Sequence, residues 1–570
     1  MMQRTFSLIL FQFLMIHVSG QDGTTFHPPV KIPIYLSGNF GEIRSDHFHS
    51  GIDIKTQGTR GHHVFYVEEG YVSRIKVQAN GYGKSIYISH PNGYTSVYGH
   101  LDSYRDDIAA HVKRMQYKQQ SHTVDLYLNK ETFPLEKGEF IAYSGNTGGS
   151  SGPHLHFEIR TTANQHPTNV LSYNFAIKDN VAPRFHSIFL YPMNNLSQIN
   201  GQSGRFSSKL VKEKGRYIIP YGTTLEASGT LGISVEVFDY LDGASNRCGI
   251  YKLEMYVDNK LSYSHVMDEF SFSETRYINA HIDYEERIRS GRKAHRLHRL
   301  PNDRLRIYLQ SLENKPMQID ASRDYPIRIV ATDVAGNSST LEFTLKGSEH
   351  TSIESNTEIT GTHLMKYNEL NRFKEGPVQV EIPANALYQD HDFTFQSSPP
   401  ADGSLTPFYQ IATREVPVQS SYTLSILSPV VDPSLHKSLL FITYNDKQEV
   451  VSAGGEYHDG SVVAKLREFG IFAIALDTIA PVISPLGNNG GDYTGKKELR
   501  FTIRDELSGI EKYEGYVDNQ WALFEYDPKN DLLSYLFDEQ RISKDSDHEL
   551  ELYVSDEKGN VNLLHTTFHW

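Results

Sequence analysis

The chain has 570 residues, and because domains typically contain about 100 to 200 residues, a single domain is excluded and about three to five are expected. The formal net charge of −14 repels a polyanion, so we expect no nucleic-acid partner. The aromatic residues are almost all Tyr and Phe, and together with 42 Gly and 24 Pro they favour short strands and turns over long helices. The composition therefore predicts a mainly β protein.

The first twenty residues have the layout of a signal peptide. A single cation, Arg4, precedes an apolar run from Phe6 to Val18, and the small residues Ser19 and Gly20 follow it. This run of 13 residues is shorter than the ~20 needed to span a bilayer. We expect residues 1–20 to be removed. The mature protein would then be exported to the periplasm, the extracellular space or the cell envelope, with no transmembrane anchor.

A candidate metal site begins at residues 47–53, which read His-Phe-His-Ser-Gly-Ile-Asp. In an extended segment, residues of equal parity share a face, so Asp53 can face one metal together with His49 or His47. Parity alone does not choose between these two histidines. Hydrolytic zinc sites use three protein ligands, His and carboxylate, and leave a position open for water.

Two further motifs supply imidazoles. Tyr98-Gly99-His100-Leu101 places one near a strand end, and Gly152-Pro153-His154-Leu155-His156 places two at i and i+2. On a strand, His154 and His156 project to the same side, roughly 6.5 to 7 Å apart. One of them can therefore bind a metal while the other reaches a substrate.

Together these motifs resemble the lysostaphin-like (LytM-type) zinc metallopeptidases that cut bacterial cell-wall peptides. The resemblance extends over about residues 30–162 and includes the glycine-rich loop 145–153. It implies a β-sheet peptidase domain of the duplicated hybrid motif type over residues 21–175. It also implies that His49, Asp53 and His156 bind Zn²⁺. His100 and His154 would be the catalytic imidazoles, which orient and deprotonate water or stabilise an oxyanion.

The sequence departs from the compact family pattern between His100 and the Lys137-Gly138-Glu139 element, where the chain is longer. The pattern of this insertion, residues 102–134, predicts a helix near Ser103–Gln119 and a strand near Thr123–Leu128. We expect the insertion to line or cover the groove that binds the substrate.

The rest of the chain contains an internal repeat. Asp179-Asn180-Val181-Ala182-Pro183 returns as Asp477-Thr478-Ile479-Ala480-Pro481, and each is followed in the same order by Gly-Ile, Tyr-Val-Asp-Asn and Asp-x-x-Gly-Asn. The landmarks resemble bacterial immunoglobulin-like β-sandwiches. They predict one such sandwich with an insertion at 176–348 and another at 477–570, with a β-sandwich-like domain at 349–476 between them.

Two features of this part have open interpretations. A basic stretch at residues 287–306 is either a solvated face or a patch that binds the wall or a partner. The single cysteine, Cys248, cannot form an internal disulfide and is expected to be a small buried hydrophobe. Only Trp521 and Trp570 offer indole rings for sugar stacking, which weakens a carbohydrate-binding interpretation.

The expected function is an exported zinc-dependent endopeptidase that hydrolyses peptide bonds in peptidoglycan stem or cross-link peptides during cell-wall remodelling. The alternative is a wall-binding regulator that activates another wall hydrolase without cutting. The expected partners are peptidoglycan peptides and a wall or envelope protein bound through the C-terminal β domains. Because every candidate site residue precedes residue 160, we also expect a fragment ending near Ile177 to fold by itself.

Overall fold

The computed structural model describes residues 26–220, 224–349, 363–401, 403–487 and 491–570. The predicted signal peptide, residues 1–20, lies outside the described residues. Within these ranges the chain is mainly β, as predicted, with 43 strands and three α-helices. None of the helices in these ranges combines the length and the apolar character that crossing a bilayer requires.

The N-terminal region forms an eleven-stranded sheet whose main path runs β1-β2-β10-β6-β5-β4-β7. Strand β10 lies between β2 and β6 and is antiparallel to both, so that His156 is paired with Asp53 on one side and Gly99 on the other. This register brings the three predicted motifs together. The strands are β1 (Leu36–Gly38), β2 (Ile52–Lys55), β3 (His63–Phe65), β4 (Gly70–Val77), β5 (Lys84–Ser89), β6 (Tyr94–Tyr104), β7 (Val124–Tyr127), β8 (Pro134–Leu135), β9 (Phe140–Ser144), β10 (His154–Thr161) and β11 (Pro167–Thr168).

The insertion has the predicted elements, α1 (Asp106–Gln119) and β7. Acidic Asp106 and Asp107 occupy the first turn of α1, where they interact favourably with the helix dipole. Ile108 and Val112 face inward, as the i, i+4 spacing of an amphipathic helix requires. The helix ends at Gln120, which adopts a left-handed conformation.

The second region has a twelve-stranded sheet with the main path β14-β12-β17-β23-β22-β18-β19. Its long connection after β19 carries η2 (Thr275–Tyr277), α2 (Ile278–His281) and α3 (Tyr284–Ser290). The strands are β12 (Arg184–Pro192), β13 (Gln198–Ile199), β14 (Phe206–Lys209), β15 (Val211–Glu213), β16 (Arg216–Ile218), β17 (Leu225–Phe238), β18 (Lys252–Val257), β19 (Lys260–Val266), β20 (His295–Arg296), β21 (Met317–Ile319), β22 (Asp324–Thr332) and β23 (Ser338–Gly347).

The first two regions share their hydrophobic cores. Leu241 and Cys248 belong to the core of the N-terminal region, whereas Phe40 and Phe48 belong to that of the second region. Cys248 is a free, buried cysteine, as predicted. The side chain of Asn39 donates to the carbonyl of Gly249 at 2.8 Å and accepts from its N–H at 2.7 Å. The chain on either side of residue 175 is therefore packed as one body.

The third region contains two five-stranded sheets and a strand pair, and the fourth contains two four-stranded sheets. The third region also contains η3 (Pro433–Ser438), the fourth contains η4 (Pro528–Asn530), and η1 (Val170–Ser172) follows β11 in the first. Third-region strands are β24 (His363–Met365), β25 (Asn371–Glu375), β26 (Val378–Ile382), β27 (His391–Phe393), β28 (Phe395–Ser398), β29 (Phe408–Ile411), β30 (Pro417–Leu427), β31 (Leu439–Tyr444), β32 (Val450–Gly454), β33 (Glu456–His458), β34 (Ser461–Glu468) and β35 (Gly470–Leu476). Fourth-region strands are β36 (Val482–Pro485), β37 (Glu498–Arg504), β38 (Ile510–Val517), β39 (Gln520–Ala522), β40 (Phe524–Asp527), β41 (Leu532–Leu536), β42 (Asp547–Asp556) and β43 (Val561–His569).

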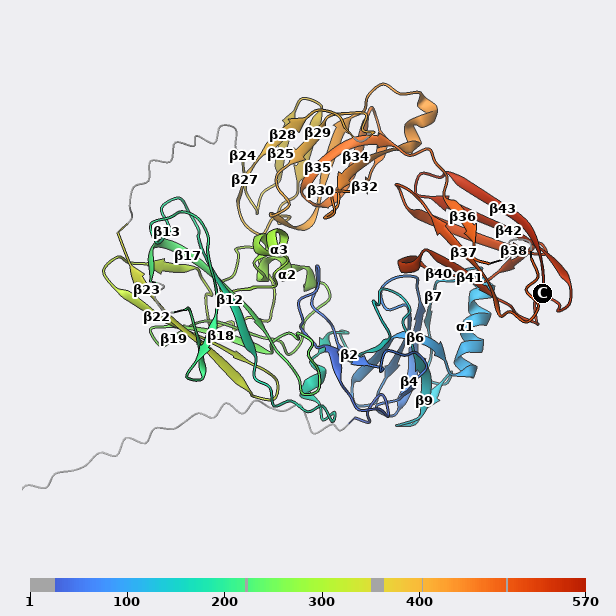
Figure 1. The fold of residues 1–570 in the computed structure, drawn as a ribbon, viewed down its shortest axis with the longest axis horizontal. Helices are drawn as coiled ribbons and strands as arrows, with labels where there is room; N and C mark the ends of the chain where they lie inside the picture. Colours follow the sequence, from blue (N-terminus) through green and yellow to red (C-terminus); the bar gives the residue numbers. More distant parts are fainter. Residues whose placement is uncertain (1–25, 221–223, 350–362, 402, 488–490) are drawn as a thin grey trace, which may run out of the picture.

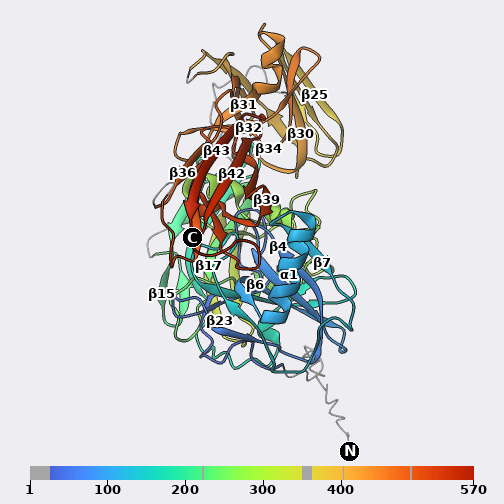
Figure 2. The ribbon, with the colours of Figure 1, turned by 90° about the vertical axis from the view of Figure 1, so that its right-hand side faces the viewer.

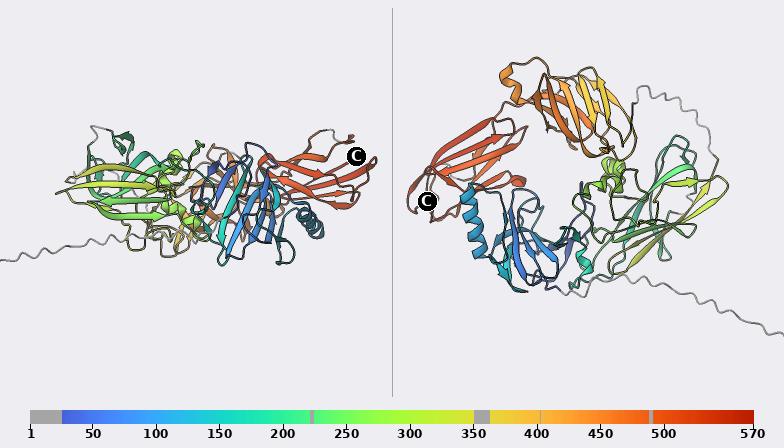
Figure 3. Two further views of the ribbon diagram at one scale, coloured as in Figure 1. Left: turned by 90° about the horizontal axis from the view of Figure 1, so that it is seen from below. Right: turned by 180° about the vertical axis from the view of Figure 1, so that it is seen from behind.

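The four regions follow one another around a ring, and the fourth returns to contact the first (Figure 1 and, from behind, Figure 3). Figure 2 shows α1 beside β39, where the ring of Tyr117 meets that of Trp521 edge-on at 5.3 Å. Lys113 forms an ion pair of 2.7 Å with Asp538. The insertion therefore binds the fourth region through its helix.

The basic stretch at 287–306 does not form one solvated face. Arg296 is buried, and its guanidinium donates to the carbonyl of Ile282 at 3.3 Å. Arg299 donates to the carbonyl of Asp303 at 2.5 Å. Several of these cations therefore stabilise the connection after β19 from within, rather than forming a continuous patch.

Candidate active site

His49, Asp53 and His156 form a compact buried cluster. His49 Nε2 lies 3.1 Å from His156 Nδ1, and Asp53 Oδ1 lies 3.0 Å from each of these nitrogens. His47, the alternative that parity left open, is half-exposed and pairs with Asp46 instead. The structure thus brings together the three residues for which the family resemblance implies metal binding.

In His49 and His156, the ring nitrogen that points away from the cluster lies within hydrogen-bond distance of an oxygen atom. His49 Nδ1–H donates to the carbonyl of Asn39 at 2.8 Å, since a carbonyl oxygen can only accept. His156 Nε2 lies 2.8 Å from a carboxylate oxygen of Glu158. Hydrogen bonds of this kind orient metal-binding imidazoles and set the nitrogen that faces the ion. Two nitrogens and one carboxylate oxygen therefore converge on one point, a donor set that fits zinc.

The charges around Asp53 favour its ionised form. Burial alone would raise the pKa of the Asp53 carboxyl, but the surrounding imidazoles, His49 first, lower it well below its usual range. Arg44 adds an ion pair of 2.8 Å to its second oxygen. Burial opposes the charged form of His156, yet hydrogen bonds to Asp53 and Glu158 raise the pKa of this imidazole to about 9. A bound cation would take the place of that proton.

The two proposed catalytic imidazoles lie side by side next to this cluster. The rings of His100 and His154 are 4.7 Å apart between centroids. His154 Nδ1–H donates to the carbonyl of Gly152 at 2.8 Å, and its Nε2 lies 3.4 Å from Asp53 Oδ1. His100 Nδ1–H donates to the carbonyl of Thr147 at 2.8 Å. Each ring therefore turns Nε2 away from the backbone, and that of His154 faces Asp53.

The backbone of His100 is left-handed, with φ of 57°. This conformation is uncommon for a residue other than glycine and is maintained only where the surroundings enforce it, often at functional sites. Burial, followed by the neighbouring His156 and His154, lowers the pKa of His100 to about 3. Its imidazole is therefore neutral at neutral pH and can accept a proton or a hydrogen bond at Nε2.

The glycine-rich loop brings its backbone close to a neighbouring turn. Gly148 has φ of +71°, and a Cβ there would lie 2.3 Å from the backbone nitrogen of Gly83. Only glycine fits this approach without displacing the turn. The contact holds the carbonyl of Thr147, the residue before it, where His100 can donate to it.

Sequence reasoning missed a polar network beneath the cluster. Glu158 accepts hydrogen bonds from Ser50 Oγ at 2.6 Å and Tyr82 Oη at 2.5 Å, and Arg160 Nε donates to it at 2.5 Å. Arg160 and His156 lower the pKa of Glu158 well below its usual range, although burial opposes this. The alternation along β10 could have identified Glu158 and Arg160, because both share the face of His154 and His156.

The cluster lies in a groove with a volume of about 970 Å³. The second region contributes Asn246, Phe272 and Thr275 to its wall. Thr275 Oγ1 also accepts a hydrogen bond of 2.9 Å from the N–H of Phe48. No residue of the insertion 102–134 lines this groove, so the expectation that the insertion forms its wall is wrong. The insertion instead binds the fourth region through α1, because Lys113 and Tyr117 face Asp538 and Trp521.

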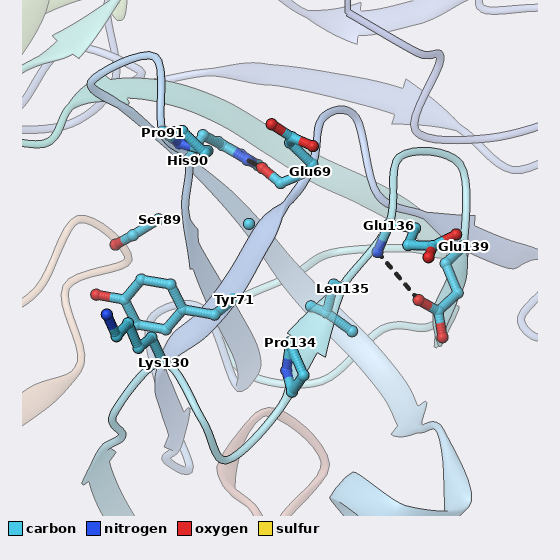
Figure 4. Close-up of a pocket in the computed structure, with 11 residues that line it drawn as sticks. Glu69, Tyr71, Ser89, His90, Pro91, Lys130, Pro134, Leu135, Glu136 and Glu139 are labelled. Carbon is cyan, nitrogen blue, oxygen red and sulfur yellow. Dashed lines mark hydrogen bonds between the residues drawn. The ribbon is translucent and has the colours of Figure 1, made fainter.

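A second hollow, of about 760 Å³, lies elsewhere on the N-terminal sheet (Figure 4). Glu69, Tyr71, His90 and Leu135 are among its lining residues, and none of the five predicted site residues takes part. Both ring nitrogens of His90 are occupied, by the carbonyl of Glu69 at 2.7 Å and by Ser96 Oγ at 2.8 Å. This histidine is therefore a structural one.

Two parts of the chain match models of known protein families. Residues 47–117 match the model of Peptidase family M23, and residues 362–477 match that of a Zu5-like domain. An uncharacterized metalloprotease of Haemophilus influenzae is 33% identical over 135 residues, which make up 24% of this chain and 21% of the relative. The DD-carboxypeptidase/endopeptidase Mpg of Neisseria meningitidis serogroup B is 30% identical over 125 residues, 22% of each chain. The chain thus spans about a fifth of the length of these curated relatives.

Solved structures are similar to about a quarter of the chain. A zinc containing peptidase from Vibrio cholerae has 23% sequence identity and a TM-score of 0.19, covering 26% of this chain and 39% of that one. The catalytic domain of the prophage-encoded M23 protein EnpA from Enterococcus faecalis has 20% identity and a TM-score of 0.19, covering 25% and 93%. The family match over residues 47–117 and the metalloprotease and endopeptidase relatives confirm the resemblance that the motifs indicate: this part of the chain is similar to metallopeptidases of family M23.

Proposed function

We propose that the protein is an exported zinc-dependent endopeptidase that hydrolyses peptide bonds in peptidoglycan. The observation that carries this proposal is the meeting of three buried donors, His49, Asp53 and His156, with the imidazoles of His100 and His154 in one open groove. The Neisseria relative, named a DD-carboxypeptidase/endopeptidase, supports wall peptides as the substrate class. The signal-like residues 1–20 support export.

In this proposal His49 Nε2, Asp53 Oδ1 and His156 Nδ1 hold the zinc ion. When bound, zinc lowers the pKa of water and polarises a carbonyl as a Lewis acid. The three donor side chains are oriented before an ion binds, because Asn39 and Glu158 fix the two rings and Arg44 fixes the carboxylate. A preorganised donor set avoids rearrangement at the moment of reaction.

His100 and His154 transfer protons and stabilise developing charge in the groove. Each donates Nδ1–H to a backbone carbonyl, which leaves Nε2 to accept a proton from the attacking water and to return it to the leaving amine. In the protonated state the same atoms donate to the developing oxyanion. The low pKa of His100 keeps this imidazole unprotonated before the reaction begins.

Digestion of purified sacculi by the full mature chain tests the proposal. We expect soluble peptide fragments, loss of activity in chelator, and recovery when zinc is returned. The matched control is His47→Ala, which removes a half-exposed imidazole of the same groove and should retain cleavage. Tight binding to sacculi with no bond cut, by zinc-loaded protein, would favour the alternative of a regulator that activates another hydrolase.

The C-terminal regions are proposed to position the peptidase against the wall or an envelope protein. Two hollows in this part of the chain, one lined by the second region and one by the second and third regions, contain none of the clusters of metal-donor residues found among the described residues. Pull-down of envelope proteins with a chain in which the peptidase site is inactivated by His100→Ala would identify such a partner.

A further inference from the structure

A second histidine cluster lies in the second region, outside the peptidase domain. It consists of His265 at the end of β19, His281 at the end of α2 and His295 at the start of β20. All three are buried, with relative exposures of 0%, 0% and 3%. One nitrogen of each ring lies within 4.8 Å of the others, and His281 Nε2 is 3.0 Å from His295 Nδ1.

Hydrogen bonds orient two of these rings from behind. Tyr308 donates its hydroxyl proton to Asp303 at 2.6 Å, so its oxygen accepts from His281 Nδ1–H at 3.0 Å and leaves the Nε2 lone pair facing the cluster. The hydroxyl of Tyr263 lies 3.0 Å from His265 Nδ1. This arrangement repeats the one around the peptidase cluster, where an oxygen behind each ring fixes the nitrogen in front.

His265 Nε2 has no hydrogen-bond partner although it is fully buried. Leaving a buried polar nitrogen unpaired costs on the order of 1 to 3 kcal/mol. A hydrogen bond between His281 Nε2 and His295 Nδ1 gives these two nitrogens a partner, but His265 Nε2 remains without one. When Nδ1 of His265 carries the proton and donates to Tyr263 Oη, this nitrogen presents a lone pair that a metal ion can accept.

We propose that His265, His281 and His295 bind a divalent transition-metal ion, with zinc as the expected ion, at a structural site separate from the peptidase centre. Three imidazole nitrogens suit such an ion and not Mg²⁺ or Ca²⁺, which prefer oxygen ligands. The nearest donors, at 3.0 Å, are spaced like those of the peptidase cluster, at 3.0 to 3.1 Å.

The site would brace the wall of the peptidase groove. His265 lies at the end of β19, and His281 and His295 lie in the chain that follows it, which also carries Phe272 and Thr275 of the groove wall. The ring of His281 packs edge-on against that of Phe48 at 5.6 Å, and Phe48 precedes the peptidase ligand His49. An ion that ties β19, α2 and β20 together would hold this wall in place.

The test measures the zinc content of the full mature chain after exposure to excess zinc and gel filtration. We expect two ions per chain in the wild type and one in Asp53→Ala/His156→Ala, which lacks the peptidase donors. Adding His265→Gln to that variant should remove the remaining ion. The matched control is His298→Gln in the same background, since His298 is also buried with an unpaired Nε2 but lies outside the cluster. That control should retain one ion.

A second measurement avoids dependence on the folding of His265→Gln. X-ray absorption at the zinc edge of Asp53→Ala/His156→Ala should show coordination by three imidazoles. Because the site is enclosed, its ion should leave in chelator at least ten-fold more slowly than the ion in the open groove of the wild type. A folded Asp53→Ala/His156→Ala protein that holds no zinc would overturn the inference, as would zinc in it bound by fewer than two imidazoles. Either result would leave the proposed peptidase site intact, because that site is tested separately by cleavage.

Discussion

At the residue scale, the site depends on which nitrogen of each imidazole faces inward. His49 presents Nε2 and His156 presents Nδ1 to the same aspartate oxygen at 3.0 Å, whereas His154 Nε2 lies farther from it, at 3.4 Å, and His100 turns its Nδ1 to the backbone. The motifs could predict which residues take part. They could not predict these ring orientations, since the orienting acceptors at Asn39 and Thr147 become neighbours only through sheet pairing and loop packing.

His100→Ala and His154→Ala should each retain zinc and lose turnover, because neither ring is among the three converging donors. The expected loss for removing one such group is about 10² to 10⁴-fold in kcat. Zinc content and the rate of wall-peptide cleavage are measured on the same samples. If His154→Ala releases the ion and His156→Ala does not, the roles within the His-x-His pair are reversed.

Glu158→Gln should weaken zinc binding without removing a ligand. The substitution keeps the size of the side chain but replaces the carboxylate that accepts from His156, and losses of this kind typically cost about 10 to 100-fold in metal affinity. Competition with a chromophoric chelator measures the change. Glu131→Gln makes the same change at an exposed residue and serves as the control. Equal zinc affinities in the two variants would argue against an orienting role for Glu158.

At the element scale, local patterns predicted local structure well. The helix and strand of the insertion form close to where the sequence placed them, as α1 and β7, because an amphipathic repeat and an alternating segment are each encoded within a few residues. The partner of α1 was not predictable in the same way. Its exposed face meets residues some 400 positions away, a contact that no local period encodes.

The shared core changes the expectation for a fragment ending at Ile177. Such a fragment loses Leu241 and Cys248 from its core, leaves Asn39 without its backbone partner and exposes Phe40 and Phe48. Fully burying one large apolar side chain contributes about 1.5 to 3 kcal/mol, so we expect a marked loss of stability or solubility. Thermal unfolding of this fragment and of one ending at residue 349 provides the comparison, and equal midpoints would show that the shared core matters little.

At the scale of the whole molecule, the fourth region touches the loop that positions His100. The ammonium of Lys529 donates to the carbonyls of Asn146 and Gly148, the two neighbours of Thr147. Lys84 of β5 forms a further ion pair of 3.0 Å with Glu525. The sequence repeat predicted a β-sandwich at 477–570. It carried no sign that this fourth region returns to the N-terminal region, because ring closure depends on the geometry of every intervening junction.

Lys529→Ala together with Trp521→Ala should weaken the contact between the fourth region and the N-terminal region. We expect faster amide hydrogen exchange in residues 145–149 and lower activity, because the carbonyl of Thr147 would orient His100 less firmly. The zinc content should not change. Lys529 and Trp521 both lie outside the groove, so a direct effect on substrate binding is not expected. Unchanged exchange in the loop would mean that ring closure does not support the active site.

The most direct test of the proposed wall endopeptidase is mass analysis of the fragments released from purified sacculi by the full chain loaded with zinc. We expect new amino and carboxyl ends within stem or cross-link peptides, with intact glycan strands. Release should stop in chelator and should be absent from Asp53→Ala. Fragments produced equally well by Asp53→Ala, or cuts confined to the glycan, would contradict the assignment of His49, Asp53 and His156 as the metal-binding core of a wall endopeptidase.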